Sequence, residues 1–149
     1  MGGLVTIKLL LECSELNVSG CIITSPLLGF GKGLNFPWHK KLMLNLFSDG
    51  LSEFIVNAKV NPTCLTKKSK YLHTIFEDRM MLPFLCVNMT KSIFQSISYV
   101  DEHMNDFRYP IIIFHGKQDQ LTDYQNSRKF IYTKVRPFKE CVLFENGYH

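Results

Sequence analysis

The sequence predicts an α/β fold in which parallel strands are joined by crossover helices. The apolar run CIITSPLLG is rich in β-branched residues and is closed by Pro26 and Gly29, which is typical of a buried strand ending at Ser25. After Pro110 the apolar run IIIFHGKQD predicts a second buried strand. LTDYQNSRKFIYTKV then fits a helix with Thr122 as its N-cap, and KECVLFENGYH fits a third strand and a turn. Strand, helix and strand at this spacing indicate a parallel βαβ unit with a right-handed crossover.

The rest of the chain is predicted to be mainly helical. From Leu4 to Glu12 the apolar residues cover nearly the whole circumference, as they do in a buried helix. Residues 30–105 contain scattered aromatic residues, mixed charges and several prolines, which favours helices separated by loops. The candidate helices are Lys40 to Leu46, Lys67 to Phe76 and Val87 to Ile97. No internal repeat or long linker marks a second independent domain.

Composition and charge argue against several classes of function. The chain of 149 residues has a formal net charge of +4, with one basic cluster, KKSK, at Lys67 to Lys70. A solvated loop accounts for that cluster, and no basic-aromatic stripe is visible, so we predict no nucleic-acid partner. The five cysteines are odd in number and form no C-x-x-C pair, which argues against a disulfide framework and a zinc site. His39, His73 and His103 show no ligand spacing, so we predict no metal and no cofactor.

The start of the chain, MGGLVTIKLLL, does not fit a signal peptide. Its apolar run is short, contains Lys8 and has no basic region before it, and it is too short for a membrane span. Met1, Gly2 and Thr6 fit the myristoylation pattern M-G-x-x-x-[ST], and acylation of Gly2 stays open as an alternative. We expect a cytoplasmic protein, with peripheral association at membranes as a further option.

Two residues that suit acid–base chemistry follow neighbouring predicted strands. Asp119 comes after the second strand, and His149 comes after the third. Functional groups collect at the carboxyl ends of parallel strands, so we expect these two side chains to lie close together. A carboxylate beside an imidazole fixes its tautomer and stabilises the imidazolium form. Composition alone would favour a simpler explanation, in which Asp119 is a turn residue and His149 is a frayed terminus. His115 is better explained by packing or hydrogen bonding than as a base.

The order of these motifs resembles that of a known family. HGKQDQLTD followed later by ENGYH resembles the end of the α/β-hydrolase fold, in particular the monoglyceride lipase, lysophospholipase and serine aminopeptidase-like group. In that group the acid is the Asp of an H-G-x-x-D motif and the base is the His of a G-x-x-H or G-Y-H motif, so the resemblance implies Asp119 as the acid and His149 as the base. MGG before a helix resembles the end of the nucleophile elbow Gly-His-Ser-Met-Gly-Gly. It implies Gly2 and Gly3 as elbow glycines and the backbone of Met1 as an oxyanion-hole donor.

The resemblance also implies a division of the chain. Residues 1–29 would form the helix and strand after the elbow, residues 30–105 a helical cap region, and residues 106–149 the strand–helix–strand unit that carries the acid and base. Within the cap region, VNPTCLTKKSKYLHTIFEDRMM resembles the family's cap segment. The chain is thus expected to be the C-terminal portion of an α/β-hydrolase.

The nucleophile is the missing part of this arrangement. The resemblance places the serine one residue before Met1, so the chain itself holds no nucleophile, and an initiator methionine has a charged amine in place of the oxyanion amide. Loss of a triad nucleophile lowers kcat by about 10⁶-fold, so we expect the chain alone to be nearly inactive.

The resemblance implies a serine hydrolase that cleaves carboxylic esters of acylglycerols or lysophospholipids through a Ser-Asp-His triad. The expected partners are a lipid ester substrate or a membrane surface that meets the cap. Two alternatives stay open: a non-catalytic hydrolase remnant that binds lipid or a protein partner, and a peptidase of the same fold. The sequence does not specify the acyl chain length or the oligomeric state.

Overall fold

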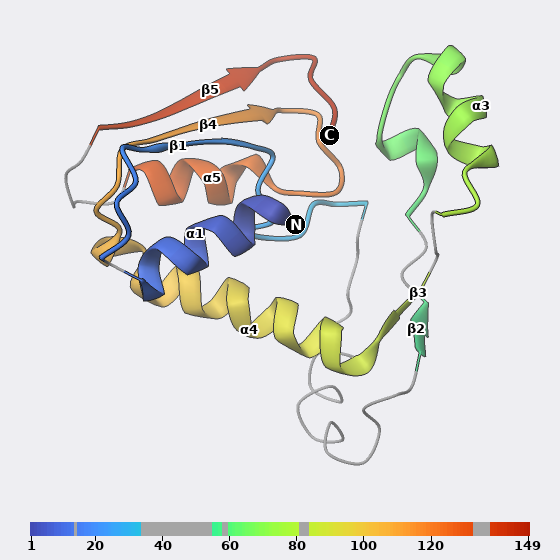
Figure 1. Ribbon diagram of the computed structural model, residues 1–149. Helices are drawn as coiled ribbons and strands as arrows, with labels where there is room; N and C mark the ends of the chain where they lie inside the picture. The colour runs from blue at the N-terminus through green and yellow to red at the C-terminus, as the bar shows by residue number, and fades with distance from the viewer. Residues whose placement is uncertain (14, 34–54, 58–59, 81–83, 133–137) are drawn as a thin grey trace.

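The computed structural model describes residues 1–13, 15–33, 55–57, 60–80, 84–132 and 138–149. Its centre is a three-stranded parallel sheet in the order β1 (Cys21–Thr24), β4 (Ile111–Gly116) and β5 (Lys139–Phe144). Helices α1 (Gly2–Glu12), α5 (Tyr124–Ile131) and α4 (Val87–His103) lie on the same side of this sheet (Figure 1). The parallel strands β4 and β5, joined through α5, confirm the predicted α/β class.

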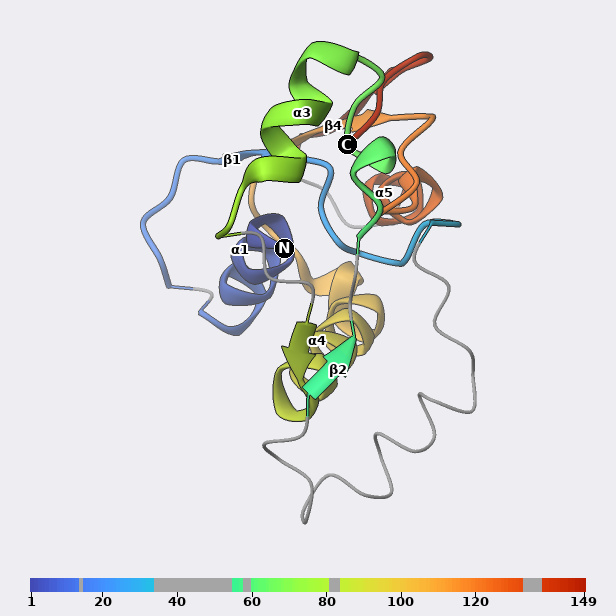
Figure 2. The same ribbon diagram turned by 90° about the vertical axis from the view of Figure 1, so that its right-hand side faces the viewer.

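Helices α1, α4 and α5 cover one face of the sheet (Figure 1). Ile111, Ile113 and His115 of β4 are buried toward them, whereas Ile22 of β1 and Phe144 of β5 are 71% and 52% exposed. Figure 2 shows α1, α5 and α4 on this one side, with α4 farthest from the strands. Side chains alternate between the two faces of a strand. The continuous apolar runs of these strands therefore did not indicate that one face of the sheet would be less covered than the other by the described residues.

Helix α1 buries a stripe rather than its whole circumference. Leu4, Ile7 and Leu10 are buried in the core at a spacing of three residues, which places them on one helical face. Val5 and Leu9 are 59% and 48% exposed. The predicted all-round burial is therefore wrong for this structure, because hydropathy does not say which faces of a helix its neighbours will cover.

The segment between β1 and β4 contains more than helices. Strands β2 (Ile55–Asn57) and β3 (Phe84–Cys86) pair antiparallel, and three residues are too few to show a period in the sequence. Helix α3 (Ser69–Glu77) confirms the helix predicted near Lys67 to Phe76. Helix α4 continues past the predicted end at Ile97, and the described part of the segment also contains the one-turn helices η1 (Pro62–Cys64) and η2 (Met104–Asp106). The predicted helix Lys40 to Leu46 lies outside the described residues.

Helix α5 begins after Asp123 rather than after Thr122. The Asp123 carboxylate accepts a hydrogen bond of 2.9 Å from the Gln125 amide and is the N-cap. The hydroxyl of Thr122 donates instead to the carboxylate of Asp119. The predicted cap is therefore wrong by one residue, because a tertiary contact takes up the side chain that could have capped the helix.

Within the described residues, no helix combines the length and the apolar character that crossing a membrane requires.

Candidate active site

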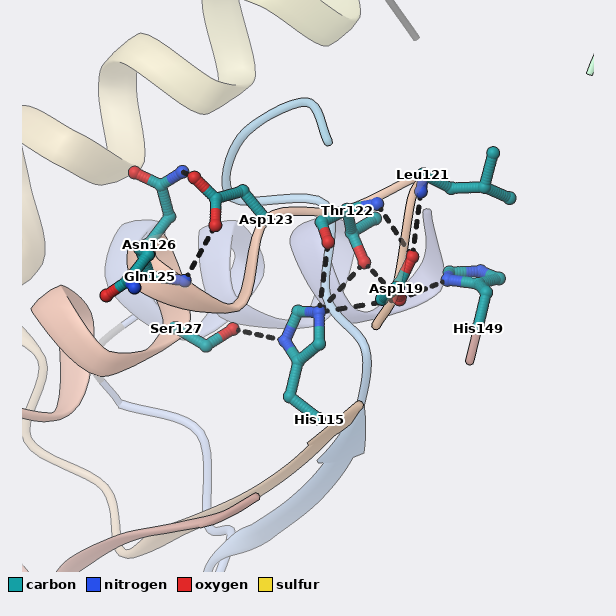
Figure 3. A network of polar contacts seen from close by, with 9 residues as sticks. All are labelled: His115, Asp119, Leu121, Thr122, Asp123, Gln125, Asn126, Ser127 and His149. Atoms are coloured by element: carbon teal, nitrogen blue, oxygen red, sulfur yellow. Dashed lines mark hydrogen bonds and ion pairs between the residues drawn. The ribbon is translucent and has the colours of Figure 1, made fainter. Parts of the chain in front are cut away.

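Asp119 and His149 meet at the carboxyl edge of the sheet. Asp119 lies in the loop after β4, His149 lies in the turn after β5, and His149 Nδ1 is 2.8 Å from Asp119 Oδ2 (Figure 3). The Asp119 side chain is fully buried, and that of His149 is 30% exposed. Since Nδ1 faces the carboxylate, Nε2 is the ring nitrogen left to exchange a proton with a reacting group.

The Asp119 carboxylate is surrounded by donors. Oδ1 accepts hydrogen bonds of 2.8 Å from the Leu121 amide and 3.0 Å from the Thr122 amide. Oδ2 accepts a bond of 2.7 Å from the Thr122 hydroxyl and lies 3.4 Å from His115 Nε2. Burial opposes ionisation, but the hydrogen bonds from His115, His149 and Thr122 outweigh it and hold the pKa of Asp119 well below its ordinary value. These hydrogen bonds therefore stabilise the ionised form of Asp119.

This low pKa makes the folded protein sensitive to acid. An unfolded aspartate has a pKa of about 3.9, so the ionised carboxylate stabilises the fold above that pH, and this contribution is lost progressively below about pH 4. We expect the free energy of unfolding to fall more steeply between about pH 5 and pH 2.5 in the native protein than in Asp119→Asn, as measured by urea unfolding. Asp78→Asn, at an exposed position, should keep the native slope. Equal slopes for the native protein and Asp119→Asn would contradict this assignment.

Main-chain hydrogen bonds hold the two loops together. We call residues 116–120, which contain the candidate acid Asp119, the acid loop, and residues 145–149, which contain the candidate base His149, the base loop. The Lys117 amide donates to the Phe144 carbonyl at 2.9 Å, and the Gln118 amide donates to the Gly147 carbonyl at 3.0 Å. The position of His149 relative to Asp119 is therefore set by the backbone as well as by the contact between their side chains.

Gly116 lies where the two loops approach each other closely. A Cβ atom at this position would lie 2.3 Å from the Gly147 carbonyl oxygen, and a backbone atom cannot rotate out of the way as a side chain can. We expect Gly116→Ala to displace the base loop and to lower the free energy of unfolding by about 1–3 kcal/mol. Urea unfolding measures this loss. Gly2→Ala is the matched control, since a Cβ there meets nothing within 4 Å, and native stability in Gly116→Ala would refute the expectation.

The N-terminal residues lie beside β1. A Cβ atom on Gly3 would lie 2.5 Å from Ile23 Cγ2 and 2.9 Å from Pro26 Cβ, so the first turn of α1 packs closely against β1 and the residues that follow it. Gly2 has open space around it. Of the two glycines predicted for an elbow, Gly3 is thus the one at a close contact, and Met1 precedes α1 as its N-cap residue.

An apolar pocket opens beside the histidine. Its volume is about 240 Å³, and both Met1 and His149 line it although they are the two ends of the chain. Its apolar walls come from Leu27, Phe30, Val60, Leu85, Ile93 and Leu121. The structure thus brings three predicted site residues, Met1, Asp119 and His149, to one place.

The segment around η1 contacts both loops. Lys67 Nζ donates to Gln118 Oε1 at 2.6 Å and lies 4.7 Å from the centre of the Tyr148 ring. The Cys64 thiol donates to Gln120 Oε1 at 3.2 Å. These contacts fix the segment around η1 against the acid loop and the neighbour of His149.

Comparison with known proteins places this arrangement in a family. Residues 1–149 match the family described as serine aminopeptidase, S33. The chain belongs to this S33 family. It is 25% identical over 150 residues to an uncharacterized abhydrolase domain-containing protein of Dictyostelium discoideum. The aligned region covers 99% of this chain and 16% of that protein.

Solved structures show which fold this S33 chain shares. It matches the monoacylglycerol lipase of Paleococcus ferrophilus with a TM-score of 0.88 at 18% identity, over 99% of the chain and 56% of that structure. It matches a soluble variant of the Saccharomyces cerevisiae monoglyceride lipase with a TM-score of 0.80 at 19% identity, over 95% of the chain and 49% of that structure. The predicted α/β-hydrolase fold is confirmed, and the chain spans about half the length of these two structures.

His73 and His103 of the S33 chain make contacts away from Asp119 and His149. His73 is paired with Glu77 on the exposed side of α3 at 3.2 Å, and His103 Nδ1 lies 2.9 Å from the Tyr99 carbonyl oxygen in α4. His39 lies outside the described residues. Among the described residues, no group of three possible ligands is placed to hold a metal ion.

Sequence reasoning missed part of the hydrogen-bond network around the Asp119 carboxylate. His115 is buried and hydrogen-bonded, as predicted, but Thr122 and Ser127 were not recognised as its partners. A threonine three residues after an acid that follows a strand is the signal that could have indicated the Thr122 contact, because such a hydroxyl can fold back onto the carboxylate.

Proposed function

We propose that this chain supplies the acid and the base of a serine hydrolase that cleaves carboxylic esters of lipids. The observation that carries the proposal is the 2.8 Å contact between His149 Nδ1 and Asp119 Oδ2 beside an apolar pocket. In the reaction, a serine hydroxyl attacks the ester carbonyl carbon while His149 Nε2 takes its proton. The imidazolium then donates that proton to the departing alcohol, and Asp119 stabilises the positive charge. Water attacks the resulting acyl-enzyme by the same proton route and releases the fatty acid.

The nucleophile under this proposal is a serine directly before Met1 in a longer protein. Support comes from the pocket, which both Met1 and His149 line, and from the close packing of Gly3 on Ile23. In that protein Met1 has an amide N–H, which would donate to the oxyanion as the residue after the nucleophile does in this fold. Residues 1–149 alone are then inactive toward esters.

An acyl chain is the substrate group that best suits the pocket. Its walls are almost entirely apolar, so burial of methylene groups there contributes about 0.8 kcal/mol each. A peptide substrate would bring amide groups that need hydrogen-bond partners. This favours acylglycerols or lysophospholipids over peptides.

The exposed side of the cap suits a lipid surface. Phe76 and Met80 are 65% and 86% exposed, and they lie in the same segment as the basic run Lys67 to Lys70. Apolar side chains beside lysines favour binding at the interface of an anionic bilayer. We therefore propose a cytoplasmic protein that meets membranes through α3 and the residues after it.

Vesicle binding tests this surface. We expect Phe76→Ser to weaken cosedimentation with vesicles of phosphatidylcholine and phosphatidylserine, because it removes an apolar anchor. Tyr132→Ser is the matched control, since Tyr132 is 73% exposed at the end of α5. Equal losses in the two variants, or no loss in either, would refute a specific role for the cap.

The hydrolase proposal is tested on the endogenous protein, captured with an antibody against residues 60–80. We expect its intact mass to exceed that of residues 1–149, and we expect it to react with a fluorophosphonate probe that labels activated serines. Recombinant residues 1–149 should not be labelled. An endogenous protein with the mass of residues 1–149 and no labelling would overturn the proposal in favour of a binding role. Release of fatty acid from a monoacylglycerol, compared with cleavage of an aminoacyl amide, separates lipase from peptidase.

A further inference from the structure

We propose that His115 is a positioning residue, which sets the direction of the Thr122 hydroxyl and so holds the Asp119 carboxylate toward His149. The meaning of this arrangement for catalysis rests on the proposed function, but the arrangement itself can be measured without substrate. It adds a second, buried histidine to the acid and base pair.

The contacts form one continuous chain behind the acid. His115 lies at the end of β4 and is 1% exposed. Its Nδ1 is 2.8 Å from the hydroxyl of Ser127 in α5, and its Nε2 is 3.0 Å from the hydroxyl of Thr122. The Thr122 hydroxyl is 2.7 Å from Asp119 Oδ2, which is 2.8 Å from His149 Nδ1 (Figure 3).

The partners of His115 Nε2 decide where its proton lies. Besides the Thr122 hydroxyl, Nε2 faces the Thr122 carbonyl oxygen at 3.3 Å and Asp119 Oδ2 at 3.4 Å. A carbonyl and a carboxylate have no proton to donate, so Nε2 must carry the hydrogen. In the neutral ring Nδ1 is then an acceptor, and the Ser127 hydroxyl donates to it.

This tautomer fixes the next hydroxyl. The Thr122 oxygen accepts the proton of His115 Nε2, so its own proton points to Asp119 Oδ2. Asp119 Oδ2 thus accepts one hydrogen bond from the Thr122 hydroxyl and another from His149 Nδ1. His149 is kept in the tautomer that leaves Nε2 unprotonated on the side of the reacting group.

The alternative is that His115 only fills the space between β4 and α5. Buried histidines often serve as packed, hydrogen-bonded core residues, and loss of such a residue lowers stability without affecting a distant proton. The two explanations differ in what they predict for the ring of His149. If His115 is a positioning residue, substituting it changes the tautomer of His149. If His115 only packs, the substitution leaves that tautomer unchanged.

The experiment measures imidazole tautomers in residues 1–149 labelled with ¹⁵N-histidine. Long-range ¹H–¹⁵N correlation spectra give the protonation of each ring nitrogen at a pH of about 8, above the ordinary histidine pKa of about 6.5. The variants are His115→Leu, which removes both ring nitrogens, and His115→Gln, whose amide nitrogen can replace the Nε2 donor. Tyr109→Phe is the matched control, because it deletes a buried hydroxyl that bonds the carbonyls of Cys13 and Leu16.

The native protein should show His115 protonated at Nε2 alone and His149 mainly at Nδ1. We expect His115→Leu to lose most of the Nδ1–H tautomer of His149, His115→Gln to restore it, and Tyr109→Phe to retain it. A native proton on Nδ1 of His115, or an unchanged His149 tautomer in His115→Leu, overturns the proposal. If His115→Leu does not fold, Thr122→Val and Thr122→Ser provide the same comparison, since valine removes the hydroxyl donor and serine keeps it. Failure of ester hydrolysis would count against the proposed function and would leave these measurements unaffected.

Discussion

Under the proposed function, replacing His149 by alanine is expected to lower kcat for ester hydrolysis by about 10⁶-fold in a longer protein that carries the serine. The reason is that no other group could then take the serine proton and return it to the leaving alcohol. Binding of the acyl chain should change little, since the pocket keeps its other walls, so the effect falls on kcat rather than on KM. Release of fatty acid from a monoacylglycerol and labelling by a fluorophosphonate probe both measure the loss.

His73→Ala is the matched control for this experiment. His73 is an exposed histidine on α3 that is paired with Glu77, and its loss should leave kcat close to the native value. If His149→Ala retained an activity similar to that of His73→Ala, His149 would not be the base.

Asp119→Asn is expected to lower kcat by about 10⁴-fold while the fold is retained. The asparagine oxygen can still accept from the Leu121 and Thr122 amides, which bond Oδ1 in the native protein. Its amide group, however, would face two donors, the Thr122 hydroxyl and His149 Nδ1. His149 would then favour the tautomer that protonates Nε2, which cannot accept a proton from the serine. Steady-state kinetics measures the loss, and circular dichroism verifies the fold.

Asp123→Asn provides the comparison for a neighbouring aspartate. Asp123 is the N-cap of α5, and asparagine caps a helix about as well as aspartate does, so this variant should remain close to native in both activity and stability. A comparable loss of activity in the two variants would point to a general disturbance of the acid loop instead of a specific role for Asp119.

The sequence predicted most of the sheet and the pairing of Asp119 with His149. Both residues follow strongly apolar runs, and parallel strands bring their carboxyl ends to one edge, so the pairing needs no knowledge of side-chain packing. The strand–helix–strand order around α5 was predicted for the same reason, because local hydrophobic patterns specify an element when the element is long enough to show its period.

Shorter and less regular features were beyond the same reasoning. Strands β2 and β3 have three residues each and no detectable period. Ile22 and Leu9 lie in strongly apolar runs and yet are exposed, because the packing of neighbouring elements decides which side chains are covered. Thr122 could have capped α5, and its preference for Asp119 depends on the path of the acid loop.

The sequence by itself determined which residues carry donors, acceptors and apolar surface. It also determined that the candidate acid and the candidate base each follow the carboxyl end of a strand. Only the tertiary structure decided that Ser127, His115 and Thr122 form a chain of hydrogen bonds to Asp119, because these contacts join β4, α5 and the loop between them. The direction of each hydrogen bond depends on which partner lacks a proton to donate. These directions can be assigned only when the tertiary structure shows which groups lie next to one another.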